Sequence, residues 1–488
     1  MVTFLIGIAV LIIGGTLYGR FTQKVMKPTD APTPAIVQRD GVDFVPMKRR
    51  KNMLIELLNI AGTGPILGPI QGILFGPIAF ITIPIGCVLG GALHDYMCGM
   101  ISVRNRGGQM PELVKIFMGK VMYHIYNVMM CVMMILVGVV FIYTPGDIFV
   151  GQVLGQETSL ANPMAVIVYV IIFGYYLMAT LFPIDKIIGK IYPIFGAILL
   201  ISAIGVLIGI FAKGYPLTEI WQADSLWQSA RGENFIPIFF VTVTCGIISG
   251  FHSSQATLVS RTISDERDGR MIFYDSMILE GLIAMIWAAA AMGALTLGLT
   301  DVETTATAPT QVVGIVSMDM LGSVGGLIAI IGVIVLPITS GDTALRSIRL
   351  MVGDALHIDQ TKRKNAFILA LVIFAVAAGL LIWAKLNPSG FSVLWRYFSW
   401  SNETIAALTL GMITIYMLLN NMPFIMALIP GMFYMFATSA YLLSAQIGFG
   451  LPYNISYVLA GVIALLYVIL LMRYGNKQKK LGIQRGYG

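Results

Sequence analysis

Long apolar stretches alternate with short polar segments along the whole chain. A helix needs about 20 predominantly apolar residues to cross a hydrocarbon core of roughly 30 Å. About 13 stretches approach this length, and together they predict an all-α polytopic membrane protein with about 13 transmembrane helices. Their approximate limits are residues 2–19, 53–76, 78–101, 121–143, 163–183, 189–212, 235–258, 273–298, 320–341, 366–385, 403–420, 422–446 and 454–472.

Composition and charge agree with this reading. The 488 residues are 57% hydrophobic and only 11% charged, far from the composition of a soluble domain. All but four of the 31 Lys and Arg residues fall in alternate loops, the exceptions being Lys213, Arg231, Lys385 and Arg396. Basic loops stay in the cytoplasm, so we expect the N-terminus outside and the C-terminus in the cytoplasm. The net charge of +7 then reflects topology and indicates no nucleic-acid partner.

The first apolar stretch has no basic region before it and no small-residue cleavage pattern, so we expect it to be retained as a helix. The second stretch contains NIAGTGPILGPIQGILFGP, Asn59–Pro77, with five glycines and three prolines. Pro65 and Pro69 remove backbone donors in the middle of a span, which membranes tolerate only where protein or water surrounds the backbone. We therefore predict an interruption near Ala61–Gly68. The alternative is that glycines at every fourth position merely allow close helix packing.

A weaker interruption is predicted in the seventh stretch, where TCGIISGFHSSQATLVSRT mixes glycine and polar residues into an apolar run. The second and seventh stretches are five spans apart and cross in opposite directions. This is the arrangement of a five-plus-five inverted repeat of the LeuT/APC type, with a discontinuous first helix in each repeat. The predicted parts are 1–52 with the first helix and a basic loop, repeats at 53–212 and 235–420, and two C-terminal helices with a basic tail at 421–488.

Two half-helices that begin at midplane breaks present unpaired N–H groups and the positive end of their dipoles to the cavity. A carboxylate is a natural ligand for such a site. The candidate substrate-binding residues are Gly62, Thr63, Gly64, Gly68, Gln71, Ser249, Gly250, His252, Ser253 and Gln255.

Ionisable residues inside the spans are candidates for ion coupling, because charges are costly in hydrocarbon. His252 is either a structural histidine or a group that contacts substrate or handles a proton. Glu280 is either a coupling carboxylate or a buried structural one. His94 and Asp95 are expected as interfacial anchors or gate partners, and Glu56 as an interfacial ion-pair partner of the nearby basic residues.

A sodium site is the other coupling hypothesis. Thr339, Ser340 and Asp342 close the ninth stretch and could join the backbone carbonyls of Ala61 and Gly64 around Na⁺, because oxygen ligands suit a hard cation. The alternative for Asp342 is an ion pair with the cation four residues later on the same helical face.

Other function classes are disfavoured by what the chain lacks. The sequence has no GxxxxGK[ST] phosphate loop, no HExxH motif and no CxxC pair. A channel would need a continuous polar file, whereas polarity here concentrates at two breaks. The adjacent His252 and Ser253 are weak support for an enzyme. We expect no enzyme activity and no cofactor apart from a coupling proton or sodium ion.

Six motifs resemble the carbon starvation protein A (CstA) family, in the family's order over roughly residues 1–420: GVDFVP, IAGTGPILGPIQG, HDYMCGMISVRNRGG, SGFHS, YDSMILEGLIAM and TSGDTALRSIRLMVGD. The resemblance implies uptake of peptides or pyruvate across the cytoplasmic (inner) membrane of a prokaryote during carbon limitation, by a cation-coupled symporter. The chain departs from long family members at Ile55 and Glu56, where they carry a His pair, and after SGFH. It looks like a short form without their extra C-terminal segments.

The resulting hypothesis is a secondary active transporter in the lipid bilayer that imports a small, pyruvate-like carboxylate by cation symport. A peptide or amino-acid importer is the alternative substrate reading, and a channel is the alternative class.

Overall fold

The computed structural model describes residues 1–40, 43–181, 185–360 and 362–481. Within these ranges the chain is almost entirely helical, and the only extended pairings are isolated bridges between Met47 and Ile263 and between Gln228 and Asn234. The prediction of an all-α membrane protein is therefore confirmed.

In the described ranges, the first half of the chain forms eleven α-helices and the second half nine. The first set is α1 (Val2–Ala9), α2 (Gly15–Met26), α3 (Pro34–Val37), α4 (Arg49–Ile60), α5 (Gly64–Gly72), α6 (Ala79–Gly86), α7 (Ala92–Arg104), α8 (Met110–Met118), α9 (Lys120–Ile148), α10 (Pro163–Leu181) and α11 (Asp185–Ala212). The second set is α12 (Phe235–Ile247), α13 (Gly250–Val259), α14 (Asp275–Thr296), α15 (Val302–Thr307), α16 (Pro309–Ala355), α17 (Arg363–Leu386), α18 (Gly390–Leu419), α19 (Ile425–Ser444) and α20 (Tyr453–Lys480).

Twelve helices in the described ranges are long and apolar enough to cross a membrane, against the expected 13 or so. The difference arises at 53–76, which does not form one continuous helix. α4 has only 12 residues, and α5 continues through a 3₁₀ segment, Ile73–Ile78, into α6. The helical run Gly64–Arg104 therefore combines part of the predicted stretch 53–76 with the stretch 78–101 and is counted once, although Gly76, with φ 75°, kinks the chain inside it.

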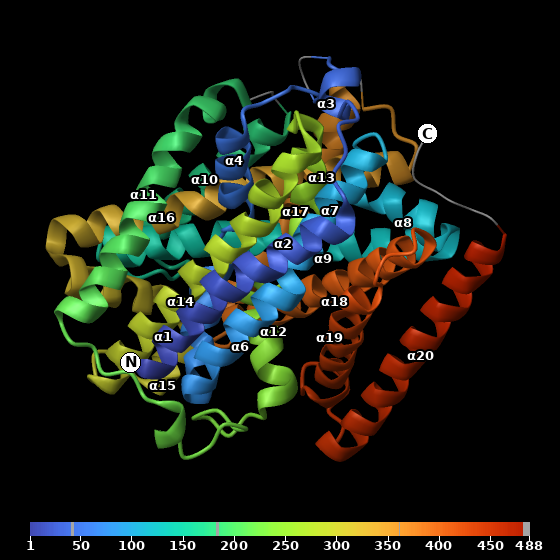
Figure 1. The fold of residues 1–488 in the computed structure, drawn as a ribbon. Helices are drawn as coiled ribbons and strands as arrows, with labels where there is room; N and C mark the ends of the chain where they lie inside the picture. Colours follow the sequence, from blue (N-terminus) through green and yellow to red (C-terminus); the bar gives the residue numbers. More distant parts are fainter. Residues whose placement is uncertain (41–42, 182–184, 361, 482–488) are drawn as a thin grey trace.

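The helices form a bundle with its chain start at one end and α3 at the other (Figure 1). α5, α12 and α14 pack on one another in the interior, while α11 packs on α16 at one side. α19 and α20, shown in orange to red, pack on each other and on α18 at the opposite side (Figure 1). Discontinuous helices stand at the start of both predicted repeats. The inverted symmetry and the domain boundaries stay predictions.

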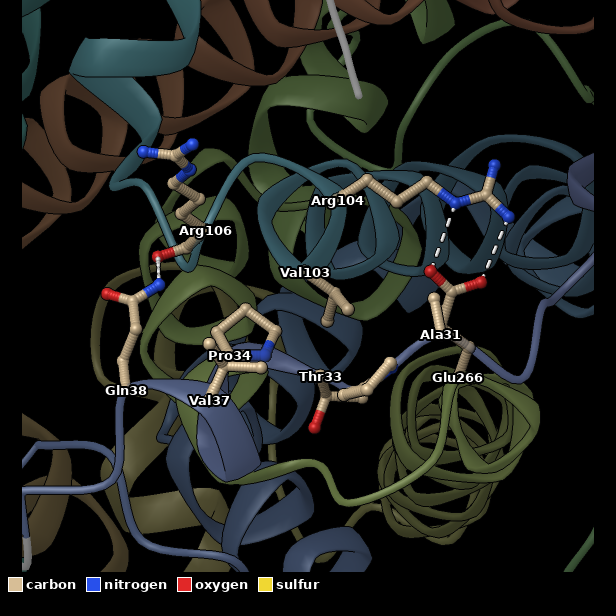
Figure 2. A pocket seen from close by; sticks show the side chains of 10 residues that line it. Ala31, Thr33, Pro34, Val37, Gln38, Val103, Arg104, Arg106 and Glu266 are labelled. Atoms are coloured by element: carbon tan, nitrogen blue, oxygen red, sulfur yellow. Dashed lines mark hydrogen bonds and ion pairs between the residues drawn. The ribbon is translucent and has the colours of Figure 1, made fainter. Parts of the chain in front are cut away.

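The segment between α2 and α4 lies across the end of α7. Arg104 donates to both carboxylate oxygens of Glu266, at 3.2 and 3.0 Å, and the backbone N–H of Thr29 donates to the same carboxylate at 2.9 Å. Figure 2 shows this ion pair and the bond from Gln38 to the Arg106 carbonyl at the edge of a cavity of about 690 Å³. These contacts fasten the segment to the bundle end.

At the other end of the bundle, the loop carboxylate of Glu219 holds the start of α1. It accepts hydrogen bonds from the Met1 ammonium, from the N–H groups of Val2 and Thr3 at 2.8 Å, and from the Thr3 hydroxyl at 2.6 Å. The first N–H groups of a helix have no intrahelical acceptor, and a negative charge there also meets the favourable end of the dipole. Glu219 thereby connects the first helix to the loop that follows α11.

The glycines of α5 allow this helix to approach α12 closely. A Cβ on Gly64 would lie 2.2 Å from Cβ of Cys245, and one on Gly68 would lie 2.8 Å from the Thr242 carbonyl oxygen. Neither distance is possible for a real side chain. The glycine repeat therefore has both roles that the sequence suggested: it allows close helix packing, and it lies next to the helix interruption.

The Glu219 contact predicts a pH-dependent contribution to stability. Burial raises the pKa of this carboxyl, but its hydrogen bonds to the N-terminal ammonium, Thr3 and Val2 outweigh burial and lower the pKa from 4.5 to about 2. The folded pKa lies below the unfolded one, so the stabilisation is complete above pH 4.5 and is lost as the pH falls towards 2. We expect Glu219→Gln to cost about 1–2 kcal/mol at pH 7 in thermal unfolding of the detergent-solubilised protein.

This cost should shrink on acidification and vanish near the folded pKa. The control is Glu157→Gln, which changes an exposed loop carboxyl. A Glu219→Gln cost that stays constant from pH 7 down to the lowest pH tolerated would contradict the assignment.

The close contact at Gly64 predicts that a single added methyl group is harmful. Gly64→Ala should lower stability by about 1–3 kcal/mol through overpacking against Cys245. Gly174→Ala is the matched control, because Gly174 lies inside α10 with nothing within 4 Å of an added Cβ. It should be neutral or stabilise by up to about 1 kcal/mol through helix propensity. Equal thermal unfolding of the two variants would refute the packing role.

Candidate functional site

The first helix interruption covers Ala61–Thr63, between α4 and α5. Ala61 leaves the helical region with φ −76° and ψ 64°, and α5 starts a new hydrogen-bonded helix at Gly64. Pro65 stands in the first turn of α5, where its missing N–H costs no helical hydrogen bond. The predicted interruption near Ala61–Gly68 is confirmed and lies at the N-terminal edge of that range.

The second interruption lies between α12 and α13. Ile248 and Ser249 are extended, with φ −160° and −145°, and α13 starts at Gly250. No proline forces this break. The predicted interruption of the seventh stretch is confirmed, and its cause is found in another part of the chain.

Asn402 of α18 stabilises the second break by supplying hydrogen bonds that the interrupted helix lacks. Its Oδ1 accepts from the Ser249 hydroxyl at 3.1 Å and from the N–H of Phe251 at 2.8 Å, while its Nδ2 donates to Sγ of Cys245 at 3.2 Å. A Cβ on Gly250 would lie 2.4 Å from the Asn402 backbone oxygen. Glycine at 250 therefore lets the break approach α18.

A fully buried group of ionisable side chains joins α7, α13 and α14 beside these breaks. Nδ1 of His94 lies 2.8 Å from Oδ1 of Asp95, and Nδ1 of His252 lies 3.0 Å from Oδ2 of Asp95. Nε2 of His252 lies 3.5 Å from Oε2 of Glu280. His94, Asp95 and Glu280 are 0% exposed and His252 is 1% exposed. We call these four residues the buried cluster.

The geometry of the buried cluster orients both imidazole rings. Each oxygen of Asp95 faces an Nδ1 atom, so both histidines donate from Nδ1 and His252 turns Nε2 toward Glu280. One proton can then reside on either side of the His252–Glu280 contact. His94 and Asp95 are buried inside the bundle, because α7 is covered by α2, α8, α13, α14 and α18. Their expected role as interfacial anchors or gate partners stays a prediction.

Glu56 is also buried, contrary to the ion pair expected for it. Its side chain is 0% exposed, and neither carboxyl oxygen has a hydrogen-bond partner among the described residues. α4 packs against α13 and α14, which brings Glu56 close enough to Asp95 and Glu280 for electrostatic interaction. The expectation failed because distance from Lys51 along the chain does not reveal which face of a short helix is covered.

A second polar group lies near the start of α13. Ser253 donates to the Gly250 carbonyl at 2.6 Å, and its hydroxyl lies 3.2 Å from the hydroxyl of Tyr126, which is 3.0 Å from that of Thr409. Gln255 is 0% exposed, and its amide atoms have no hydrogen-bond partner in the described part of the chain. Thr63 is likewise buried without a partner for its hydroxyl there.

The remaining predicted substrate residues fall into two groups. Gly62 lies against the ring of Phe141, and Gly64 and Gly68 pack against α12. Gln71 lies two turns further along α5, away from the break. With its side-chain amide turned so that both the nitrogen and the oxygen have partners, the nitrogen donates to the Ala306 carbonyl at 3.3 Å. Binding of substrate at any of these positions stays a prediction.

The predicted sodium site is only partly described. The Ser340 hydroxyl donates to backbone carbonyls at the end of α4, Leu58 at 3.4 Å and Asn59 at 3.2 Å, next to the first break. The side chains of Thr339 and Asp342 lie outside the described residues. Over the residues that were placed, no group of three or more His, Cys, Asp or Glu side chains is arranged to hold a metal ion.

Several polar residues of the interior were not singled out from the sequence. Asn402 and Glu403 fall at the edge of the predicted stretch 403–420, whereas α18 starts at Gly390. Both are 0% exposed, and the Glu403 carboxyl has no hydrogen-bond partner within the described ranges. A search for polar residues flanking apolar stretches would have found them, because charges inside a membrane protein mark function by default.

The role of Asn402 predicts local opening of the second break when its amide is removed. Asn402→Ala leaves the N–H of Phe251 buried without its acceptor, which costs about 1–3 kcal/mol. Hydrogen exchange of the amides at 248–253, followed by mass spectrometry, should accelerate by roughly 5- to 150-fold. Asn420→Ala is the control, because Asn420 caps the same helix by donating to Tyr416 at 2.9 Å. Unchanged exchange at 248–253 in Asn402→Ala would contradict the assignment.

Comparison with known proteins adds a family and a fold. The sequence matches the family "Carbon starvation protein CstA" over residues 1–181 and 137–302. It is 40% identical over 332 residues to an uncharacterized membrane protein of Haemophilus influenzae, covering 59% of this chain and 89% of that one. It is 28% identical to the peptide transporter CstA of Helicobacter pylori, covering 56% and 48%, and 26% identical to the pyruvate/proton symporter BtsT of Escherichia coli, covering 54% and 45%.

The matches to these two transporters span about half of their length. Among solved structures, the manganese transporter of Eremococcus coleocola superposes with a TM-score of 0.54 at 12% identity, covering 92% of this chain and 99% of the other. A single-residue variant of that transporter gives a TM-score of 0.55. This likeness concerns the fold alone. From the family match over the first 302 residues, this multi-pass membrane protein belongs to the carbon starvation protein CstA family.

Proposed function

We propose that this protein is a secondary active transporter that imports a small, pyruvate-like carboxylate across the cytoplasmic membrane together with a cation. The observation that carries the proposal is the position of two helix breaks beside a fully buried cluster of ionisable residues. Membrane proteins tolerate irregular backbone and buried charge together mainly where a substrate or ion pathway needs them. The names of the Helicobacter and Escherichia relatives support a transporter in the same family.

An anionic substrate suits the ends of the two half-helices. α5 and α13 start at the breaks, so their positive dipole ends and the remaining N–H groups of their first turns can attract a carboxylate. The N–H of Phe251 is already bonded to Asn402, and Pro65 has none. No Lys or Arg occurs in the breaks, which leaves these backbone groups as the main attraction. A peptide or an amino acid also presents a carboxylate, and it is the alternative substrate class.

A proton is the coupling ion that the described side chains favour. His252 has one ring nitrogen on Asp95 and the other facing Glu280, so gain or loss of a proton changes the charge balance of both contacts. Sodium remains the alternative, through Ser340 of α16, whose hydroxyl bonds carbonyls at the end of α4, together with the predicted ligands Ala61, Gly64 and Thr339.

Apolar packing around the breaks argues against an open channel. Gly62 contacts Phe141, whose ring centroid lies 6.4 Å from the centroids of both Phe251 and Phe398. These rings come from α9, α13 and α18 and would have to separate before a solute could pass. Such an arrangement fits alternating access, in which the site opens to one side at a time.

The orientation proposed from the basic loops fits the fold. The chain starts at one end of the bundle, and the basic segment around α3 lies at the other (Figure 1). With the basic end in the cytoplasm, the N-terminus is outside. Import in response to carbon limitation is the physiological role that we propose from the family.

Uptake of radiolabelled pyruvate into proteoliposomes, under separately imposed pH and Na⁺ gradients, tests this function. We expect a pH gradient, acidic outside, to drive accumulation, and His252→Ala to reduce that accumulation by roughly 5- to 150-fold, the range for coupling energies of 1–3 kcal/mol. His124→Ala is the matched control, because His124 is exposed on α9. It should transport like the unmodified protein.

Competing solutes decide the substrate class. Inhibition by alanyl peptides or amino acids without pyruvate uptake would keep the transporter and replace its substrate. Accumulation driven by Na⁺ alone would assign sodium as the coupling ion. If no gradient moved any of these solutes through correctly folded protein, the proposed function would be wrong.

A further inference from the structure

The Glu56 carboxyl lies outside the hydrogen-bonded contacts of the buried cluster. It is located one turn before the end of α4, the first half of the broken helix, and is 0% exposed. Neither of its oxygens has a hydrogen-bond partner among the described residues. A pathway through His252 and Glu280 alone gives this residue no role.

Burial without a partner determines the protonation state of Glu56 in this conformation. Removing a carboxylate from water costs several kcal/mol unless a cation or hydrogen-bond donors compensate it. Asp95 has such compensation, because each of its oxygens faces a histidine Nδ1 atom. Glu56 has none and also interacts with Asp95 and Glu280, two further acids. The neutral, protonated form of Glu56 is therefore the one that fits this structure.

The titratable side chains near Glu56 can hold one exchangeable proton of their own, apart from the proton on Glu56. Asp95 and Cys98 on α7 and Glu280 on α14 interact with Glu56 directly. His94 and His252 are connected to it only through Asp95 and Glu280. Asp95 is hydrogen bonded to both histidines. The Glu280 oxygens, like those of Glu56, have no hydrogen-bond partner in the described residues, but Glu280 lies 3.5 Å from His252 and can share one exchangeable proton with it. Glu56 is not hydrogen bonded to either residue, which makes its proton a separate one.

We propose that this protein carries two protons per substrate molecule, one on the His252–Glu280 pair and a second on Glu56. The inference rests on the proposed function, proton-coupled import of a carboxylate. Both protons bind from outside and are released inside, when movement of the half-helices brings water to each group in turn. A monocarboxylate with one proton would cross without net charge, whereas two protons make the transported unit carry one positive charge. Glu56 would thereby make uptake respond to the membrane potential.

The test measures pyruvate accumulation in proteoliposomes in sodium-free buffer. At zero membrane potential, a gradient of one pH unit should give accumulation of about 100-fold with two protons and about 10-fold with one, because each proton contributes one tenfold factor. An interior-negative potassium diffusion potential should increase accumulation by the unmodified protein. In Glu56→Gln we expect the pH-driven limit to fall from about 100-fold to about 10-fold, with no response to the potential.

Two variants serve as controls. Glu56→Asp keeps a carboxyl and should keep both the higher limit and the potential response. Glu403→Gln removes another carboxyl that is 0% exposed and without a hydrogen-bond partner in the described residues, but on α18 and outside the buried cluster. It should leave the proton ratio at two. Exchange of labelled for unlabelled pyruvate without any gradient shows that each variant is folded and binds substrate.

The outcomes separate this inference from the proposed function. Gradient-driven uptake by the unmodified protein that ignores the membrane potential would overturn the two-proton inference and keep the transporter. A potential response that persists in Glu56→Gln, or that Glu403→Gln abolishes equally, would also overturn it. Absence of uptake by the unmodified protein under every gradient would instead reject the proposed function itself.

Discussion

Satisfaction of the backbone in a medium without water is the constraint on which this structure depends. A helix that stops inside a membrane leaves donors and acceptors that neither lipid nor water can satisfy. At the second break, a side chain from a distant helix supplies part of what is missing, because Asn402 accepts from the N–H of Phe251. At the first break, Pro65 removes a donor that would otherwise be left without a partner. Both solutions require the breaks to be enclosed by protein, and this enclosure is what makes a binding site there physically possible.

Charged groups in the interior follow the same rule. Asp95 is accommodated by two imidazole donors, and at one end of the bundle Lys385 is paired with Asp147 and lies 4.1 Å from the centroid of the Tyr143 ring. Glu56 and Glu403 lack any such partner in the described ranges. Because an unpaired carboxylate is so costly there, these residues can be buried only in their neutral form. A protein that must bind and release protons can use this difference between paired and unpaired acids.

Much of the fold could be predicted because its signals are local. The apolar stretches, the prolines at 65 and 69, and the glycine and polar run around His252 lie in short segments of the chain. They led to most of the helices and to both interruptions, although α16 and α18 begin at Pro309 and Gly390, well before the predicted stretches 320–341 and 403–420. The burial of His94, Asp95 and Glu56 was not foreseen, because it depends on which neighbouring helices cover each face. The involvement of Asn402 was missed for the same reason, since it lies 153 residues from the hydroxyl that it accepts from.

The sequence by itself determined the membrane class, the helical content, the approximate spans and the positions at which two of them break. These properties follow from hydropathy and from backbone chemistry that each residue carries with it. Only the tertiary structure decided which polar groups meet. The contact between His252 and Asp95, the isolation of Glu56 and the hydrogen bonds of Asn402 each join helices that are far apart in the chain. Such contacts depend on which helix faces pack together. The pattern of apolar and polar residues along the chain does not specify this for individual residues.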